Sequence, residues 1–221
     1  MRRVLLLAVA VSLGLSAVAR AASSPESLWL SGAQFEKKLS LSKSLPGDPP
    51  DPAVVLKAAK RGLDRAYRLD MDYKMLLNTV AETQAELDKF ASDPQPAQRD
   101  RIENLLKFLA DAMPVEGDRM DAVLNSVQYL YFELPAKPDA ELVKAVRDLD
   151  AYIGRDDQAV EAFAAAAAKL QARTTELEAS LGGRAPWLAA KLTEDADQGV
   201  KFFDFVKEQS AKVVAKLGSA K

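Results

Sequence analysis

The sequence contains no cysteine and no histidine. Disulfide bonds are therefore excluded, and so are metal sites that use thiolate or imidazole ligands. A serine or threonine nucleophile would lack the imidazole base that usually activates it. Only oxygen ligands for hard cations such as calcium or magnesium remain, and no group of acids has the spacing of such a site. We therefore predict a protein that is not an enzyme, with no catalytic residue, no cofactor and no metal.

Aromatic residues and excess positive charge are also scarce. Aromatic residues make up 7% of the chain, and alanine is abundant. This composition favours helices over β-sheets. The 30 lysines and arginines are outnumbered by 32 aspartates and glutamates. Because affinity for nucleic acid depends largely on basic side chains that contact phosphates, we predict no nucleic-acid partner.

Long apolar runs are absent except at the start of the sequence. There, two arginines precede an apolar run at residues 4–19, and the small-residue site Ala19-Arg20-Ala21 follows. This pattern is typical of a secretory signal peptide. We predict a signal peptide at residues 1–21, with 17–19 as an alternative cleavage site, and no transmembrane segment after its removal. The expected location is periplasmic or extracellular.

The predicted mature chain divides into two parts of different composition. Residues 22–52 are rich in serine and end in a stretch with four prolines between Pro46 and Pro52. Proline at this density prevents a continuous helix, so we predict a mobile segment with a short helix at 31–44 and then a linker. Residues 53–221 are predicted to form a single helical bundle domain.

Apolar residues recur at helical spacing throughout residues 53–221, and no segment shows the alternation of a strand. The sequence predicts an all-α fold, an irregular bundle of six to seven helices. The first five predicted helices are 53–68, 70–92, a helix containing 102–113, one containing 120–134, and one containing 142–153. Pro114 and Gly154 are the expected breaks after the third and fifth of these helices.

Two longer heptad patterns follow near the C-terminus. The first runs from Val160 to Leu181 and the second from Leu188 to Leu217, with Gly182-Gly183 between them. Apolar residues at alternating steps of three and four are typical of helices that pack as coiled coils. The sequence therefore predicts a long C-terminal antiparallel helical hairpin.

One predicted helix, 53–68, carries a row of basic side chains opposite its apolar face. A basic amphipathic helix can lie on an anionic membrane surface, so this row is a candidate contact with such a surface. The alternative, which we favour, is the solvated face of a helix packed in the bundle. The residues are Lys57, Lys60, Arg61, Arg65 and Arg68.

Three aromatic residues lie off the core stripes of their own helices: Tyr129, Phe132 and Phe205. Aromatic side chains anchor many protein interfaces and also line apolar pockets. We take these three residues as a candidate partner or ligand surface. The alternative for Tyr129 and Phe132 is burial between two layers of helices.

The sequence predicts a non-catalytic exported (periplasmic) helical protein that acts as a protein-binding adaptor, chaperone or accessory subunit in the cell envelope. The alternative is a periplasmic carrier of a lipid or other hydrophobic ligand held between helices. An enclosed cavity lined by leucine and aromatic side chains would favour the carrier. A filled core with an exposed aromatic patch would favour the adaptor.

Overall fold

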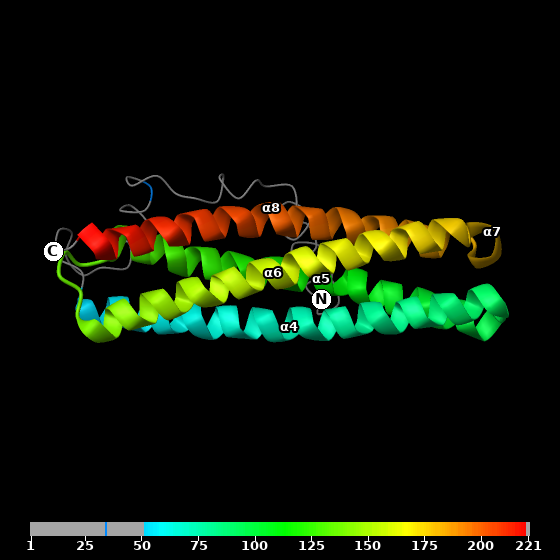
Figure 1. Ribbon diagram of the computed structural model, residues 1–221, viewed down its shortest axis with the longest axis horizontal. Coiled ribbons are helices and arrows are strands. Elements are labelled where there is room, and N and C mark those ends of the chain that lie inside the picture. The colour runs from blue at the N-terminus through cyan, green and yellow to red at the C-terminus, as the bar shows by residue number, and fades with distance from the viewer. Residues whose placement is uncertain (1–33, 35–50, 220–221) are drawn as a thin grey trace, which may run out of the picture.

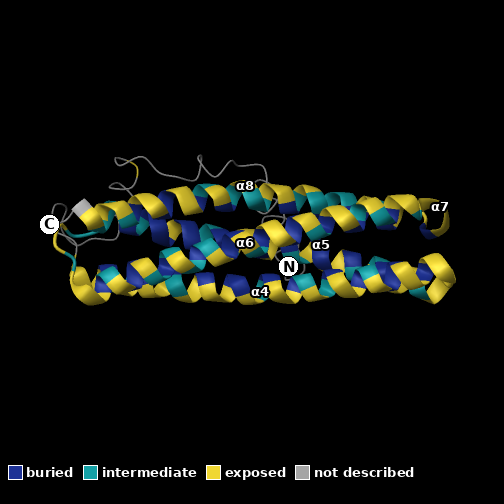
Figure 2. Cartoon of the chain, in the orientation of Figure 1, coloured by how far each residue is buried: buried dark blue, intermediate teal, exposed yellow. Residues whose placement is uncertain are grey.

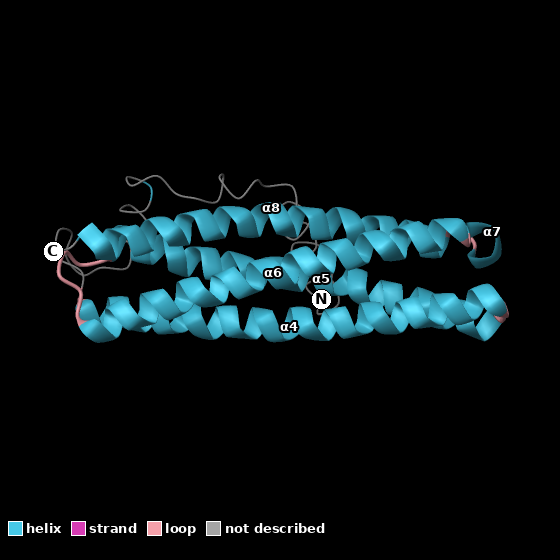
Figure 3. Ribbon diagram, in the orientation of Figure 1, coloured by secondary structure: helices cyan, strands magenta, loops and turns pink. Residues whose placement is uncertain are grey.

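The computed structural model describes Gln34 and residues 51–219, so the predicted signal peptide and most of the N-terminal segment lie outside the described residues. Four long helices and one short helix account for almost all of residues 51–219, and this part of the chain contains no strand (Figure 3). The predicted all-α class is therefore confirmed. The helices are α4 (Pro52–Ser92), α5 (Pro96–Glu133), α6 (Ala140–Glu176), α7 (Glu178–Leu181) and α8 (Arg184–Ser219).

The four long helices form two antiparallel hairpins that pack on each other as an elongated bundle (Figure 1). One hairpin is α4 with α5, and the other is α6 with α8. Between the hairpins, α4 packs against α6 and α5 packs against α8. Each long helix therefore has two principal neighbours and keeps one face toward solvent, as Figure 2 shows by the yellow exposed residues along every helix.

Local signals at the helix ends explain where the chain turns. Asp51 caps α4 by accepting a hydrogen bond from the Ala53 amide at 2.9 Å, and Asp139 caps α6 in the same way with the Leu142 amide at 2.8 Å. Such caps satisfy backbone donors that have no partner inside the helix. After α7, Gly182 adopts a φ of 81°, a conformation that favours glycine, and the chain reverses into α8.

The core runs the length of the bundle and is built from the apolar stripes of all four long helices. Both heptad patterns near the C-terminus point inward: Phe163, Leu170, Leu192 and Phe203 are fully buried. The predicted C-terminal antiparallel hairpin is thus present as α6 and α8, joined through α7.

Three predicted helix breaks are wrong. The helix α4 continues through Leu69 and Asp70, α5 continues through Pro114, and α6 continues through Gly154. Pro114 is exposed, and the buried residues Met113 and Met120 on either side of it face the same core. Core packing of the α5 segments before and after Pro114 outweighs the backbone hydrogen bond that proline cannot donate. Residues 51–219 form five helices, so the count of six to seven is not confirmed.

The helix α4 approaches its neighbours most closely at Gly62. A Cβ atom placed on Gly62 would lie 2.9 Å from Cβ of Ser126 in α5 and 3.0 Å from Cδ2 of Leu149 in α6. Real Cβ contacts are essentially never this short, so the absence of a side chain allows the three helices to meet here. This contact fixes the position of α4, the helix that carries most of the candidate site described below.

Candidate functional site

Large apolar side chains that remain exposed are concentrated on one hairpin. Among the described residues there are seven of them, six on α4 and α5, one on α8 and none on α6. They are Val54, Tyr67, Met71 and Met75 on α4, Phe108 and Val115 on α5, and Trp187 on α8. Clustering of this kind is informative because single exposed apolar residues are common but grouped ones mark interaction surfaces.

On α4, three of these residues form a stripe. Tyr67, Met71 and Met75 are each four residues apart, which places them on one face of the helix. Their exposed fractions are 48%, 49% and 52%. Tyr67 lies at the α6 side of the stripe, where its ring packs edge-on against Tyr152 with centroids 6.0 Å apart.

On α5, Phe108 and Val115 are seven residues apart and therefore share a face. An ion pair between Arg119 of α5 and Asp72 of α4 sets the register of the hairpin. Because the helices are antiparallel, Val115, one turn before Arg119, lies level with Met75, about one turn after Asp72. The register thus brings Met75 and Val115 side by side, and we call the exposed residues Tyr67, Met71, Met75, Phe108 and Val115 of the two helices the α4–α5 apolar face.

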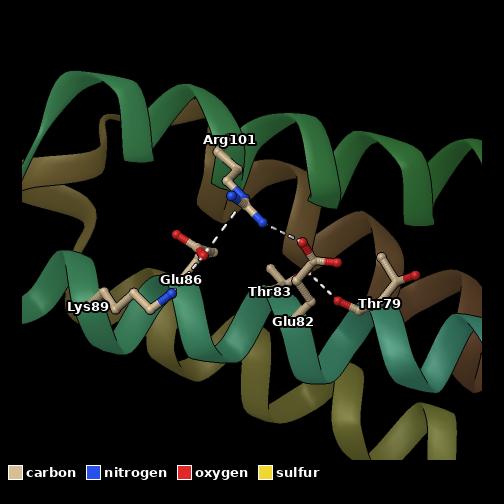
Figure 4. Close-up of polar contacts among 6 residues, drawn as sticks. All are labelled: Thr79, Glu82, Thr83, Glu86, Lys89 and Arg101. Atoms are coloured by element: carbon tan, nitrogen blue, oxygen red, sulfur yellow. Dashed lines mark hydrogen bonds and ion pairs between the residues drawn. The ribbon is translucent and has the colours of Figure 1, made fainter.

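A polar network holds the hairpin together beyond the apolar face (Figure 4). Arg101 of α5 reaches Glu82 of α4 at 2.7 Å and Glu86 at 3.7 Å, and Lys89 binds the same Glu86 carboxylate at 3.0 Å. The hydrogen bond with Glu82 raises the pKa of Arg101 above its ordinary value, and the charge of Glu86 adds to this effect. The network fixes the spacing of α4 and α5.

The structure places the predicted basic row on the outer side of α4 but gives its members different roles. Lys60 pairs with Glu141 of α6 at 2.5 Å, and Arg68 pairs with Asp64 at 3.1 Å. Arg65 donates to the Ala122 carbonyl at 2.9 Å and to the Ser126 hydroxyl at 3.1 Å, both in α5. Arg65 therefore serves helix packing.

Lys57 and Arg61 differ from the rest of the row. Neither has an acidic partner within the described part of the chain. Together they border an open depression of about 430 Å³ at the start of α4, which is also lined by Ala53, Leu56, Lys60 and Asp64. Because this depression lies on the outside of the bundle, it is not the interhelical pocket that a carrier would use. Lys57 and Arg61 thus place two positive charges on α4, the helix that also carries Tyr67, Met71 and Met75 of the α4–α5 apolar face.

The three predicted aromatic residues Tyr129, Phe132 and Phe205 are all partly buried. Tyr129 and Phe205 pack against the core, and burial raises the pKa of the Tyr129 hydroxyl, with smaller contributions from Glu133 and Asp51. The Phe132 ring lies edge-on to Tyr131 at 5.1 Å. These side chains offer less apolar surface than the α4–α5 apolar face.

Three acidic side chains of α6 and α8 lie close enough together to resemble a metal site. Carboxylate oxygens of Asp157, Glu161 and Asp204 lie within 4.8 Å of one another. The ammonium group of Lys207 binds Asp157, and the charges of Glu161 and Asp204 help raise the Lys207 pKa. We therefore describe these four residues as an ion-pair network, since a lysine already supplies the positive charge.

The residues of the α4–α5 apolar face were not selected from the sequence. The available signal was that Met71, Met75, Phe108 and Val115 are apolar yet lie off the buried stripes of their helices. Within the described helices, no stretch is both long and apolar enough to cross a membrane. No family model matches this chain, and no curated protein or solved structure matches it either.

Proposed function

We propose that this chain is a non-catalytic exported protein that binds a partner protein in the cell envelope, as an adaptor, chaperone or accessory subunit. The observation that carries the proposal is the concentration of exposed apolar residues on α4 and α5, six of the seven in the described part of the chain. Methionine and aromatic side chains are enriched at protein interfaces, and methionine adapts to partners of different shape.

The surface favours an amphipathic helix of another protein as its partner. From Lys57 to Met75 the outer side of α4 spans about 27 Å, which a helix of similar length can cover. Its apolar side chains would cover Tyr67, Met71 and Met75. Acidic side chains at one end would meet Lys57 and Arg61, which have no acidic partner within the described part of the chain. Complementary charge of this kind fixes orientation and speeds association.

The proposal is tested by comparing two double variants of the full chain, expressed in its native host. Met71→Glu with Met75→Glu places charge in the apolar face. The matched control is Ala165→Glu with Ala168→Glu, at exposed positions of α6. Envelope proteins are cross-linked, purified with each variant and quantified by mass spectrometry. We expect a partner that is retained by the wild type and the control and is lost from the methionine variant.

Equal recovery of the same proteins with all three forms would contradict the proposal. Native mass spectrometry of the purified wild type provides the second readout. Two results together would support the carrier alternative instead. One is a stoichiometric lipid that stays bound through purification, and the other is partner recovery that does not change in the methionine variant.

A further inference from the structure

A buried carboxyl group in α6 has no partner. Asp156 is 0% exposed, and neither of its carboxyl oxygens has a hydrogen-bond partner. An ionised carboxylate in such surroundings is strongly disfavoured. Burial, with a smaller contribution from the charge of Asp70, raises the pKa of Asp156 to about 8, and Lys74 opposes the shift.

Asp70 of α4 lies opposite Asp156. The parallel helices α4 and α6 are in register at the Tyr67–Tyr152 ring contact and at the Asp88–Arg173 ion pair, where the α6 residue is numbered 85 higher in both cases. Asp156 is numbered 86 higher than Asp70. The two carboxyl groups are therefore on the same level of the bundle, and Asp70 is also buried, with 6% exposure.

Within the described residues, Lys74 is the cation that acts on both acids. Its ammonium group binds Asp70 at 2.6 Å, and Asp156 forms no ion pair of its own. Two neighbouring carboxylates next to a single cation repel each other strongly. A proton on Asp156 removes this repulsion.

The groups on the other elements do not supply the missing charge. Arg119 of α5 is bound to Glu116, and Lys207 of α8 is bound to Asp157. Burial raises the pKa of Glu116 and that of Tyr73 of α4, and the charges of Glu116 and Asp156 add to the shift at Tyr73. These shifts raise the cost of a negative charge at Glu116 and Tyr73, and neither group supplies a positive charge to Asp156.

We propose that Asp156, buried beside Asp70 and protonated in the folded bundle, makes the packing of α6 on α4 sensitive to rising pH. The bundle is more stable while the proton is present. Since the unfolded chain releases this proton near the ordinary pKa of 3.8, stability falls as pH rises from about 4 to about 8 and then levels off. This inference is independent of the proposed function.

The test measures the melting temperature of the full chain at pH 6, 7, 8 and 9 by circular dichroism. We expect the wild-type value to fall by roughly 5–10 °C over this range. Asp156→Asn keeps the shape of a protonated aspartate but needs no proton, so its melting temperature should exceed that of the wild type at pH 6 and should fall much less between pH 6 and pH 9. Asp157→Asn is the matched control, because it changes the adjacent buried acid that is already paired with Lys207.

The control should retain the wild-type dependence on pH, although its melting temperature is lower throughout. A wild-type slope in Asp156→Asn would overturn the proposal. If that variant does not fold, infrared spectroscopy of the wild type decides the question. A protonated-carboxyl absorption at pH 6 that disappears by pH 9 supports the proton on Asp156, and its absence at pH 6 overturns the proposal.

Discussion

The two hairpins contribute the same kind of surface to the core but differ on the outside. Fully buried apolar residues line α4 and α5 as densely as they line α6 and α8. On the outer faces, α4 and α5 expose six large apolar side chains, whereas α6 and α8 expose only Trp187 within the described residues. Core formation therefore does not account for the exposed residues of the first hairpin, and the second hairpin is the natural reference for any test of binding.

The largest expected effect tests whether the two hairpins share one core. Leu170 of α6 and Leu106 of α5 are both 0% exposed. Replacing either by aspartate buries an unpaired charge and should cost more than about 4 kcal/mol. Lys201→Asp, at an exposed position of α8, should change the thermal melt little. A bundle that tolerates one of the two leucine changes would show that the hairpins are energetically separate.

A pair of glycine variants should change stability in opposite directions. Gly62→Ala forces α4 away from Ser126 and Leu149 and should destabilise the protein by about 1–3 kcal/mol. Gly117→Ala in α5 meets nothing within 4 Å and removes backbone freedom from the unfolded chain. It should therefore stabilise by about 0.5–1 kcal/mol. Chemical denaturation measures both values, and a loss of stability in both variants would contradict the close approach at Gly62.

Phe205→Ala and Phe132→Ala are expected to have intermediate effects. Both side chains are partly buried, so each truncation should cost about 1–2 kcal/mol, less than the 3–5 kcal/mol typical of a core phenylalanine. Partner recovery should fall less than with Met71→Glu and Met75→Glu. If either variant lost the partner completely and kept the wild-type melting temperature, these aromatic residues would be the main binding surface.

The smallest effect concerns Lys57 and Arg61, which have no acidic partner within the described residues. Lys57→Gln with Arg61→Gln should leave the melting temperature nearly unchanged, because both side chains are exposed. We expect weak sedimentation of the wild type with anionic vesicles, a small decrease in the variant, and no difference at high salt. Strong wild-type binding that the variant abolishes would favour the membrane-surface interpretation of α4.

The second hairpin was more predictable from sequence than the first. Its heptads from residue 160 onward end at Gly182, where the chain does turn, although Gly154 wrongly suggested a break earlier in α6. In the first hairpin, two predicted breaks do not occur, one before Asp70 and one at Pro114. The preference of proline for ending a helix is outweighed at Pro114 by the burial of Met113 and Met120 in the same core. Such tertiary compensation depends on the neighbouring helices, which a single sequence does not specify.

The candidate site was less predictable than the fold. Spacing placed Lys57 and Arg61 correctly on an outer face, but it could not reveal that Arg65 is used by α5. Met75 and Val115 are distant in sequence and become neighbours only through the antiparallel register marked by the Asp72–Arg119 ion pair. The burial of Asp156 could not be predicted either. The sequence does not show whether an aspartate within a helix has a hydrogen-bond partner, and Asp156 has none.

The central claim is that α4 and α5, and not α6 and α8, bind the partner. The most direct measurement introduces a photo-crosslinking amino acid in place of Met71, Met75 or Phe108, and separately in place of Ala165, Ala168 or Ala211 at exposed positions of the second hairpin. After irradiation of intact cells, we expect one discrete protein adduct from the first three positions and none from the other three. The same adduct from both hairpins, or an adduct only from the second, would contradict the claim.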